Sequence, residues 1–156
     1  MMISEASPIQ ERNKRIVEIY FKALDQGDLF ALDQLFSGDC LIHRPGVIEP
    51  LRGIEGISSV VKGAAERYRS LSTKINAMLA EENLVACRLT HRAEFARPWD
   101  TRIGTFDVSN RVVIWHPLVL FSMKMGKIVE QWVCRDDLGM LIDLGALTAV
   151  THQPPP

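Results

Sequence analysis

The sequence predicts an α+β domain: a cone-shaped barrel in which a curved, mostly antiparallel sheet wraps around N-terminal helices. Over about the first 70 positions, apolar residues recur with the three-to-four-residue spacing of amphipathic helices. From position 72 the spacing falls to two, as in strands with one buried face. Helices followed by successive strands favour an α+β arrangement over alternating βαβ units, and a curved sheet closed by helices leaves a hollow suited to a ligand.

The three helices of the N-terminal half have recognisable starts and ends. Ser7-Pro8-Ile9-Gln10 can begin the first helix, because serine caps, proline suits the first helical position and glutamine completes a capping box. Gly27 ends this helix, and Asp28 can cap a second, short one. A third helix is predicted from about Gly53 to Leu71, with its inward face again at helical spacing.

The strands follow from the alternating pattern and from turn residues. A short strand precedes the Pro45-Gly46 turn, and the segment 96–110, with its proline, glycine and charges, is predicted to be a long loop or flap. A closing helix begins near Asp137. The predicted strands cover 39–43, 72–80, 84–95, 111–124 and 127–135.

Composition and charge exclude several classes of partner and compartment. The 156 residues suit one domain, 1–150, with a disordered tail at 151–156. A net charge of −1 gives no reason to expect nucleic acid or an anionic membrane as partner. Three widely spaced cysteines and the lack of an apolar leader or long apolar run predict a cytoplasmic protein without disulfides, signal peptide or membrane span.

His91 is the polar residue on an otherwise apolar strand face. Alternation along 84–95 places it with Val85, Cys87, Leu89 and Phe95, and so inside the hollow. It is a candidate for acid–base chemistry. The alternative is a core histidine whose ring nitrogen is bonded to a backbone carbonyl.

Asp136 is the second candidate, because the same alternation places it on one face with Ile128 and Trp132. If that face is internal, burial would raise the pKa of Asp136 and make it a useful general base. The alternative is that Asp136 caps the closing helix, a role for which Asp137 competes.

Two further histidines are less well placed by pattern alone. His43 ends a short strand next to a loop, a common position for functional residues. On the strand 111–124 both faces are apolar, so alternation cannot choose between Trp115 and His116 as the cavity residue. No spacing matches a known metal motif, and we expect neither a metal nor a cofactor.

A family resemblance rests on a combination of short motifs. From about Asn13 to Leu147 the chain resembles the SnoaL-like polyketide cyclase family of the NTF2-like superfamily. The motifs are Ile16-Val17-Glu18-Ile19-Tyr20, Gly27-Asp28, Asp39-Cys40-Leu41-Ile42-His43, Arg52-Gly53-Ile54-Glu55-Gly56, Thr90-His91, Gly126-Lys127-Ile128-Val129-Glu130-Gln131-Trp132, Asp136, Leu138-Gly139-Met140-Leu141 and Leu144-Gly145.

The resemblance implies a homo-oligomeric enzyme, a homodimer or larger, that closes a ring by intramolecular aldol condensation without a cofactor. The family's catalytic aspartate matches Asp136, and its two histidines match His43 and His91. We expect a small apolar or aromatic ligand. Its predicted contacts are Trp132, Trp115, His116, Phe95 and Tyr20.

Two other functions are alternatives to the predicted polyketide cyclase activity. The segment Arg97 to Asn110 departs from the family's usual turn beside the substrate, which leaves the substrate class open. A dehydratase or epoxide hydrolase on the same fold is one alternative. Arg92-Ala93-Glu94 loosely matches the Arg-x-acid pair of such hydrolases. However, alternation turns both charged side chains outward. A binding protein without catalytic activity is the other.

Overall fold

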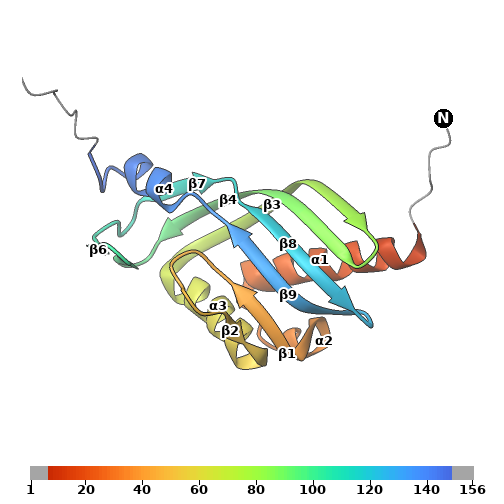
Figure 1. Cartoon of the computed structure of the whole chain (residues 1–156). Coiled ribbons are helices and arrows are strands. Elements are labelled where there is room, and N and C mark those ends of the chain that lie inside the picture. Colours follow the sequence, from red (N-terminus) through yellow and green to blue (C-terminus); the bar gives the residue numbers. More distant parts are fainter. Residues whose placement is uncertain (1–6, 149–156) are drawn as a thin grey trace, which may run out of the picture.

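The computed structural model describes residues 7–148, in which four helices pack against a curved sheet that does not close on itself (Figure 1). The helices are α1 (Pro8–Gln26), α2 (Leu32–Leu35), α3 (Gly53–Arg67) and α4 (Asp137–Asp143). The strands are β1 (Phe36–His43), β2 (Leu51–Arg52), β3 (Tyr68–Glu81), β4 (Leu84–Phe95), β5 (Trp99–Thr101), β6 (Gly104–Phe106), β7 (Val112–Trp115), β8 (Leu118–Lys124) and β9 (Lys127–Cys134). The α+β prediction is therefore confirmed.

Helix α1 begins as its sequence predicts. The Ser7 hydroxyl accepts a hydrogen bond from the Gln10 backbone N–H, and the Gln10 side chain accepts one from the Ser7 backbone N–H. Gly27 ends the helix in a left-handed conformation, φ 66°, which glycine adopts without a side-chain clash. The helix start and stop thus follow from local chemistry.

The main sheet has the strand order β2-β1-β9-β8-β4-β3, with β7 pairing beside β8 on β4. The β1–β9 pair is parallel and the other pairs are antiparallel. Helix α1 contacts β3 and α3 contacts β1, so both long helices lie on the same, concave face (Figure 1). This arrangement brings the C-terminal ends of β1 and β9 together.

Bulges shape the sheet and change which residues face inward. In β9, Ser122 opposes Glu130 and Met123 opposes Ile128, which leaves Val129 as an extra residue. A bulge bends the strand, and by adding one residue it reverses the alternation beyond it. Consequently Ile128 and Gln131, three positions apart, are both fully buried.

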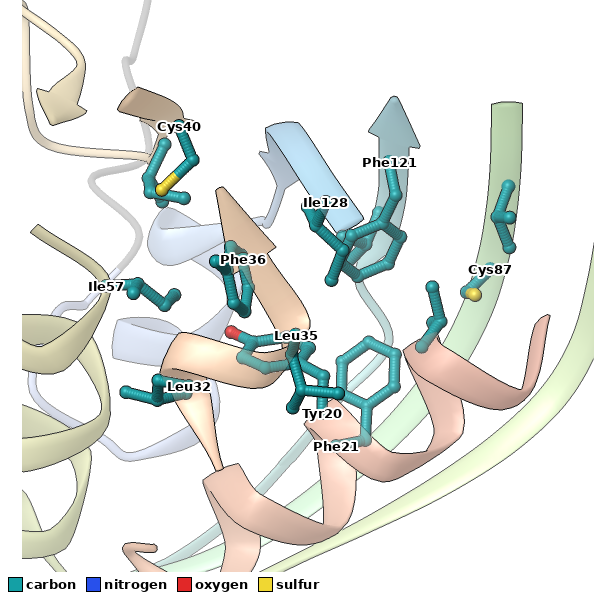
Figure 2. Packing of buried hydrophobic residues seen from close by; sticks show 14 of the residues in the cluster. Tyr20, Phe21, Leu32, Leu35, Phe36, Cys40, Ile57, Cys87, Phe121 and Ile128 are labelled. Carbon is teal, nitrogen blue, oxygen red and sulfur yellow. The ribbon is translucent and has the colours of Figure 1, made fainter. Parts of the chain in front are cut away.

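Two apolar clusters lie under the sheet. The larger joins α1, α2 and α3 to β1, β4, β8 and β9, and Figure 2 shows Tyr20 and Phe21 of α1 directed toward Phe36 and Phe121. The smaller cluster surrounds Phe95 and joins the start of β3, β5, β7 and α4. Residues of both clusters line a cavity between the helices and the sheet.

Several segments differ from the predicted boundaries, and β1 begins at Phe36 rather than at 39. Helix α3 ends at Arg67, because Tyr68 already pairs with Phe95 on β4. The predicted strand 111–124 is divided into β7 and β8 around Pro117, which has no backbone N–H to donate. The predicted loop 96–110 contains the β5–β6 hairpin.

The domain boundary at 150 stays a prediction, and the tail at 151–156 lies outside the described residues. Within residues 7–148, no helix is long and apolar enough to cross a membrane.

Candidate functional site

A cavity of about 720 Å³ opens between the helices and the sheet. Its walls come from α1, α3, the loop after β1, the β5–β6 hairpin and the inner faces of β4, β7 and β9. Most of the wall is apolar or aromatic, which suits a flat organic molecule. The polar side chains that break this surface are the candidates for chemistry.

His91 lies in this wall, 7% exposed, as the alternation along β4 predicts. The Trp115 ring lies 4.9 Å away, centroid to centroid, at 38°. Burial, together with the positive charges of Arg44 and Arg135, lowers the pKa of His91 to about 4. The ring is therefore uncharged at neutral pH.

A hydrogen-bond relay fixes which nitrogen of His91 carries the proton. The Thr73 hydroxyl donates to Oδ1 of Asp25 over 2.5 Å, and the Thr73 backbone N–H donates to Oδ2 over 2.7 Å. Nδ1 of His91 lies 2.9 Å from the same hydroxyl oxygen. Because that hydroxyl proton is already donated to Asp25, Nδ1–H is the donor to Thr73 and Nε2 keeps its lone pair.

Asp25 belongs to α1 and Thr73 to β3, so the relay links three elements. Burial raises the pKa of Asp25, and the two hydrogen bonds from Thr73 oppose that rise. Sequence reasoning missed both residues, because a helix residue and a strand residue 48 positions apart give no local signal.

Two arginines bring positive charge into the same cavity. Arg44 follows β1, and burial lowers the pKa of its guanidinium. Arg135 follows β9, where burial opposes ionisation but the hydrogen bonds to Asp137 raise its pKa. Together they give this end of the cavity a positive potential, which favours negative charge on a bound molecule.

Two buried polar atoms facing this region have no hydrogen-bond partner within residues 7–148: the Tyr68 hydroxyl and Oε1 of Gln131. Burial also raises the pKa of Tyr20, against the effects of Arg44 and Gln131, so its phenol stays protonated at neutral pH. Buried polar groups normally have partners, so such atoms in a cavity wall are suited to a ligand.

Of the residues predicted from sequence, the structure brings His91, Trp115 and Tyr20 together in the cavity wall. It also answers the question that alternation left open on β7. Trp115 faces the cavity, whereas His116 is exposed and lies 3.1 Å from the Thr90 hydroxyl.

The predicted inward direction of Asp136 and Trp132 is wrong. The bulge at Val129 reverses the alternation, so Gln131, Val133 and Arg135 face the cavity instead. Asp136 is exposed and accepts a hydrogen bond from the Gly139 backbone N–H, as the N-cap of α4.

His43 and Phe95 also lie outside the cavity wall. His43 stacks on Trp132 on the opposite face of the sheet, with ring centroids 5.1 Å apart and 2° between the planes. Its Nε2 lies 2.7 Å from Glu130. Phe95 faces inward but is fully buried in the smaller apolar cluster.

Three cavity residues that sequence reasoning missed lie one position away from predicted site residues. Arg44 is one position beyond His43, and Gln131 and Arg135 each precede a residue that was selected, Trp132 and Asp136. Because of the bulge, the inward-facing residues of β9 lie one position before those that strict alternation predicts. No group of three or more metal-ligating side chains is found among residues 7–148.

The sequence profile of the SnoaL-like polyketide cyclase family matches residues 14–144, most of the chain. The chain belongs to this family. None of the curated protein sequences matches it.

Solved structures of similar proteins confirm the fold. TsrD from Streptomyces laurentii superposes with a TM-score of 0.77 at 23% identity, covering 92% of this chain and all of TsrD. IdmH from Streptomyces antibioticus, a proposed polyketide cyclase, gives 0.71 at 23%, covering 85% and 98%. An LEH-like epoxide hydrolase from M. tuberculosis gives 0.69 at 18%, covering 88% and 92%. At these identities the likeness concerns the fold alone.

Proposed function

We propose that the protein is a cofactor-independent acid–base enzyme of the cyclase type, acting on a small, flat, apolar carbonyl compound. One observation carries the proposal: the Asp25–Thr73–His91 relay leaves an unprotonated nitrogen on a ring in the wall of an aromatic cavity. Such a nitrogen can accept a proton from the carbon beside a carbonyl.

In the proposed reaction, every bond that breaks is matched by a bond that forms, and the proton returns to the product. The substrate C–H bond breaks, its proton moves to Nε2 of His91, and the electron pair becomes an enolate whose oxygen lies in the positive potential of Arg44 and Arg135. The enolate carbon then attacks a second carbonyl of the same molecule, and the new alkoxide takes the proton back from His91. Trp115 provides an aromatic surface for the substrate.

The pKa of about 4 keeps Nε2 of His91 unprotonated but makes it a weak base in the free protein. The same arginines that disfavour the imidazolium in the free protein favour the enolate, and the enolate's negative charge in turn favours the imidazolium. Asp136 and His43, the other candidates from sequence, are not among the residues that line this cavity: Asp136 caps α4 and His43 stacks on Trp132.

The experiment is exchange of the acidic C–H protons of an apolar aromatic ketone for deuterium, followed by NMR. We expect His91→Gln to lower the enzyme-catalysed exchange rate by roughly 10²–10⁴-fold. His43→Gln is the matched control on the other face of the sheet and should leave the rate unchanged. Full exchange activity in folded His91→Gln protein would contradict the proposal.

A second candidate is epoxide hydrolysis, favoured by one observation. Arg92 is exposed and Glu94 is bonded to Arg69, so the pair considered from sequence is outside. However, Arg135 and Asp137 form an Arg-x-Asp pair inside the cavity. Hydrolysis of styrene oxide that is lost in Asp137→Asn but retained in His91→Gln would favour this function over the first.

A further inference from the structure

The charges in the cavity wall are unbalanced. Four arginines and two aspartates line it, although the whole chain has a net charge of −1. One of the aspartates, Asp137, is already bonded to Arg135. Among the described residues, the cavity wall therefore carries more positive than negative charge.

Arg44 is a cation of this wall whose charge is disfavoured by burial, which lowers the pKa of its guanidinium. Within residues 7–148 its guanidinium makes no ion pair and no side-chain hydrogen bond, and it is only partly exposed. Burial is the main cause of its lowered pKa; Tyr20 and Tyr68 oppose that effect, and two further cations, Arg135 and Arg67, add to it. An unpaired cation removed from water is unfavourable, so its retention in a cavity wall indicates that an anion binds there.

The neighbouring groups fit the same interpretation. The hydroxyl of Tyr68, 7% exposed, is a hydrogen-bond donor without an acceptor in the described chain. Tyr68 also acts electrostatically on both Arg44 and Arg135, so the three polar groups lie in one region of the wall. A carboxylate accepts hydrogen bonds from a guanidinium and a phenol at once.

We propose that the ligand of this cavity is a flat apolar molecule that carries a carboxylate, and that Arg44 and Tyr68 bind the carboxylate. This inference rests on the proposed function for the rest of the site, and it adds a charged group to the substrate. The aromatic wall around Trp115 holds the apolar part, and Arg44 fixes its orientation relative to His91.

The carboxylate also changes the state of His91. The charged groups acting on that ring are Arg44 and Arg135 at the ends of β1 and β9, and Asp25 of α1 through Thr73. Trp115 covers the ring from β7. A bound anion offsets the effect of Arg44, so it raises the pKa of His91 from about 4 toward its ordinary value.

The test compares an aromatic acid with its neutral analogue. Calorimetric titration of the full chain with naphthoate and with naphthamide should show at least about tenfold tighter binding of the acid, since charge-assisted hydrogen bonds are about twice as strong as neutral ones. Arg44→Gln should remove that preference and Arg44→Lys should keep part of it. Arg92→Gln, which removes an exposed arginine on the outer face of β4, should preserve it.

A second measurement follows the His91 ring by NMR during a pH titration. The pKa of His91 should rise with naphthoate bound, stay low with naphthamide, and rise without any ligand in Arg44→Gln. Three results would overturn the inference. They are equal binding of acid and amide, failure of the acid to bind, and a preference for the acid that survives in folded Arg44→Gln. The proposed function fails on a different result, retained exchange of a neutral ketone by His91→Gln.

Discussion

Two histidines on opposite faces of one sheet show how tertiary position decides chemical role. His91 is buried in the cavity wall, with its Nδ1 bonded to Thr73 and two arginines acting on it. His43 lies outside, stacked on Trp132 and bonded to Glu130. One ring is held uncharged beside a cavity, whereas the other has a carboxylate partner and access to water.

The comparison teaches that a residue's neighbours in the chain are poor guides to its environment here. His43 is followed directly by Arg44, which faces the cavity, and Trp132 is preceded by Gln131, which is fully buried. On a strand, one position separates a surface ion pair from a buried polar group. Matched substitutions on the two faces of the sheet test how far the environments of their side chains differ.

The largest expected difference is in the pH dependence of stability. The pKa of His91 is about 4 in the folded protein and about 6.5 when unfolded, so the unfolded chain binds more protons between these values. The stabilisation is complete above pH 6.5 and is lost as the pH falls toward 4. The loss is up to about 3 kcal/mol in the free energy of unfolding.

Urea unfolding at pH 7 and pH 4.5 measures this loss in the wild type and two variants. His91→Gln should lose less stability than the wild type, because glutamine does not titrate. Arg92→Gln, which removes an exposed arginine on the outer face of the same strand, is the control and should follow the wild-type curve. Identical pH dependence in all three proteins would mean that His91 is not held uncharged by its surroundings.

A smaller difference is expected between two threonine–histidine pairs. Thr73→Val removes the hydroxyl that links Asp25 to His91, and a lost buried hydrogen bond costs about 1–2 kcal/mol. It should also let the proton move between the His91 nitrogens, which ¹⁵N NMR detects, and lower the exchange rate.

Thr90→Val is the matched control, because the Thr90 hydroxyl donates to Asn76 and lies near the exposed His116, away from the cavity. It should change stability by less than about 0.5 kcal/mol and leave the exchange rate unaffected. Equal effects of the two valine variants on that rate would argue against the relay.

The smallest expected effect concerns Asp136. Because its carboxylate caps α4, Asp136→Ala should cost about 1 kcal/mol of stability, whereas Asp136→Asn, which caps as well, should cost only a few tenths. Both variants should retain exchange activity. Loss of activity in folded Asp136→Asn would restore the catalytic role that the family resemblance implies.

Much of the architecture was predictable because its signals are local. The capping box at Ser7, the left-handed Gly27 and the change of hydrophobic period each depend on a few adjacent residues. His91 was placed correctly because β4 has no bulge of its own before that position. The inward direction of Trp115 depends on its pairing with His91 on β4, which is a contact between distant segments.

The sequence by itself determined the α+β class, the family and one inward histidine, since these follow from hydrophobic spacing and short motifs. The tertiary structure alone decided which polar residues share the cavity. The extra residue Val129 reverses the faces of β9, and it is specified by how β9 pairs with both β1 and β8. Pairing between distant segments sets such a bulge, so Arg135 and Gln131, and not Asp136 and Trp132, face the cavity.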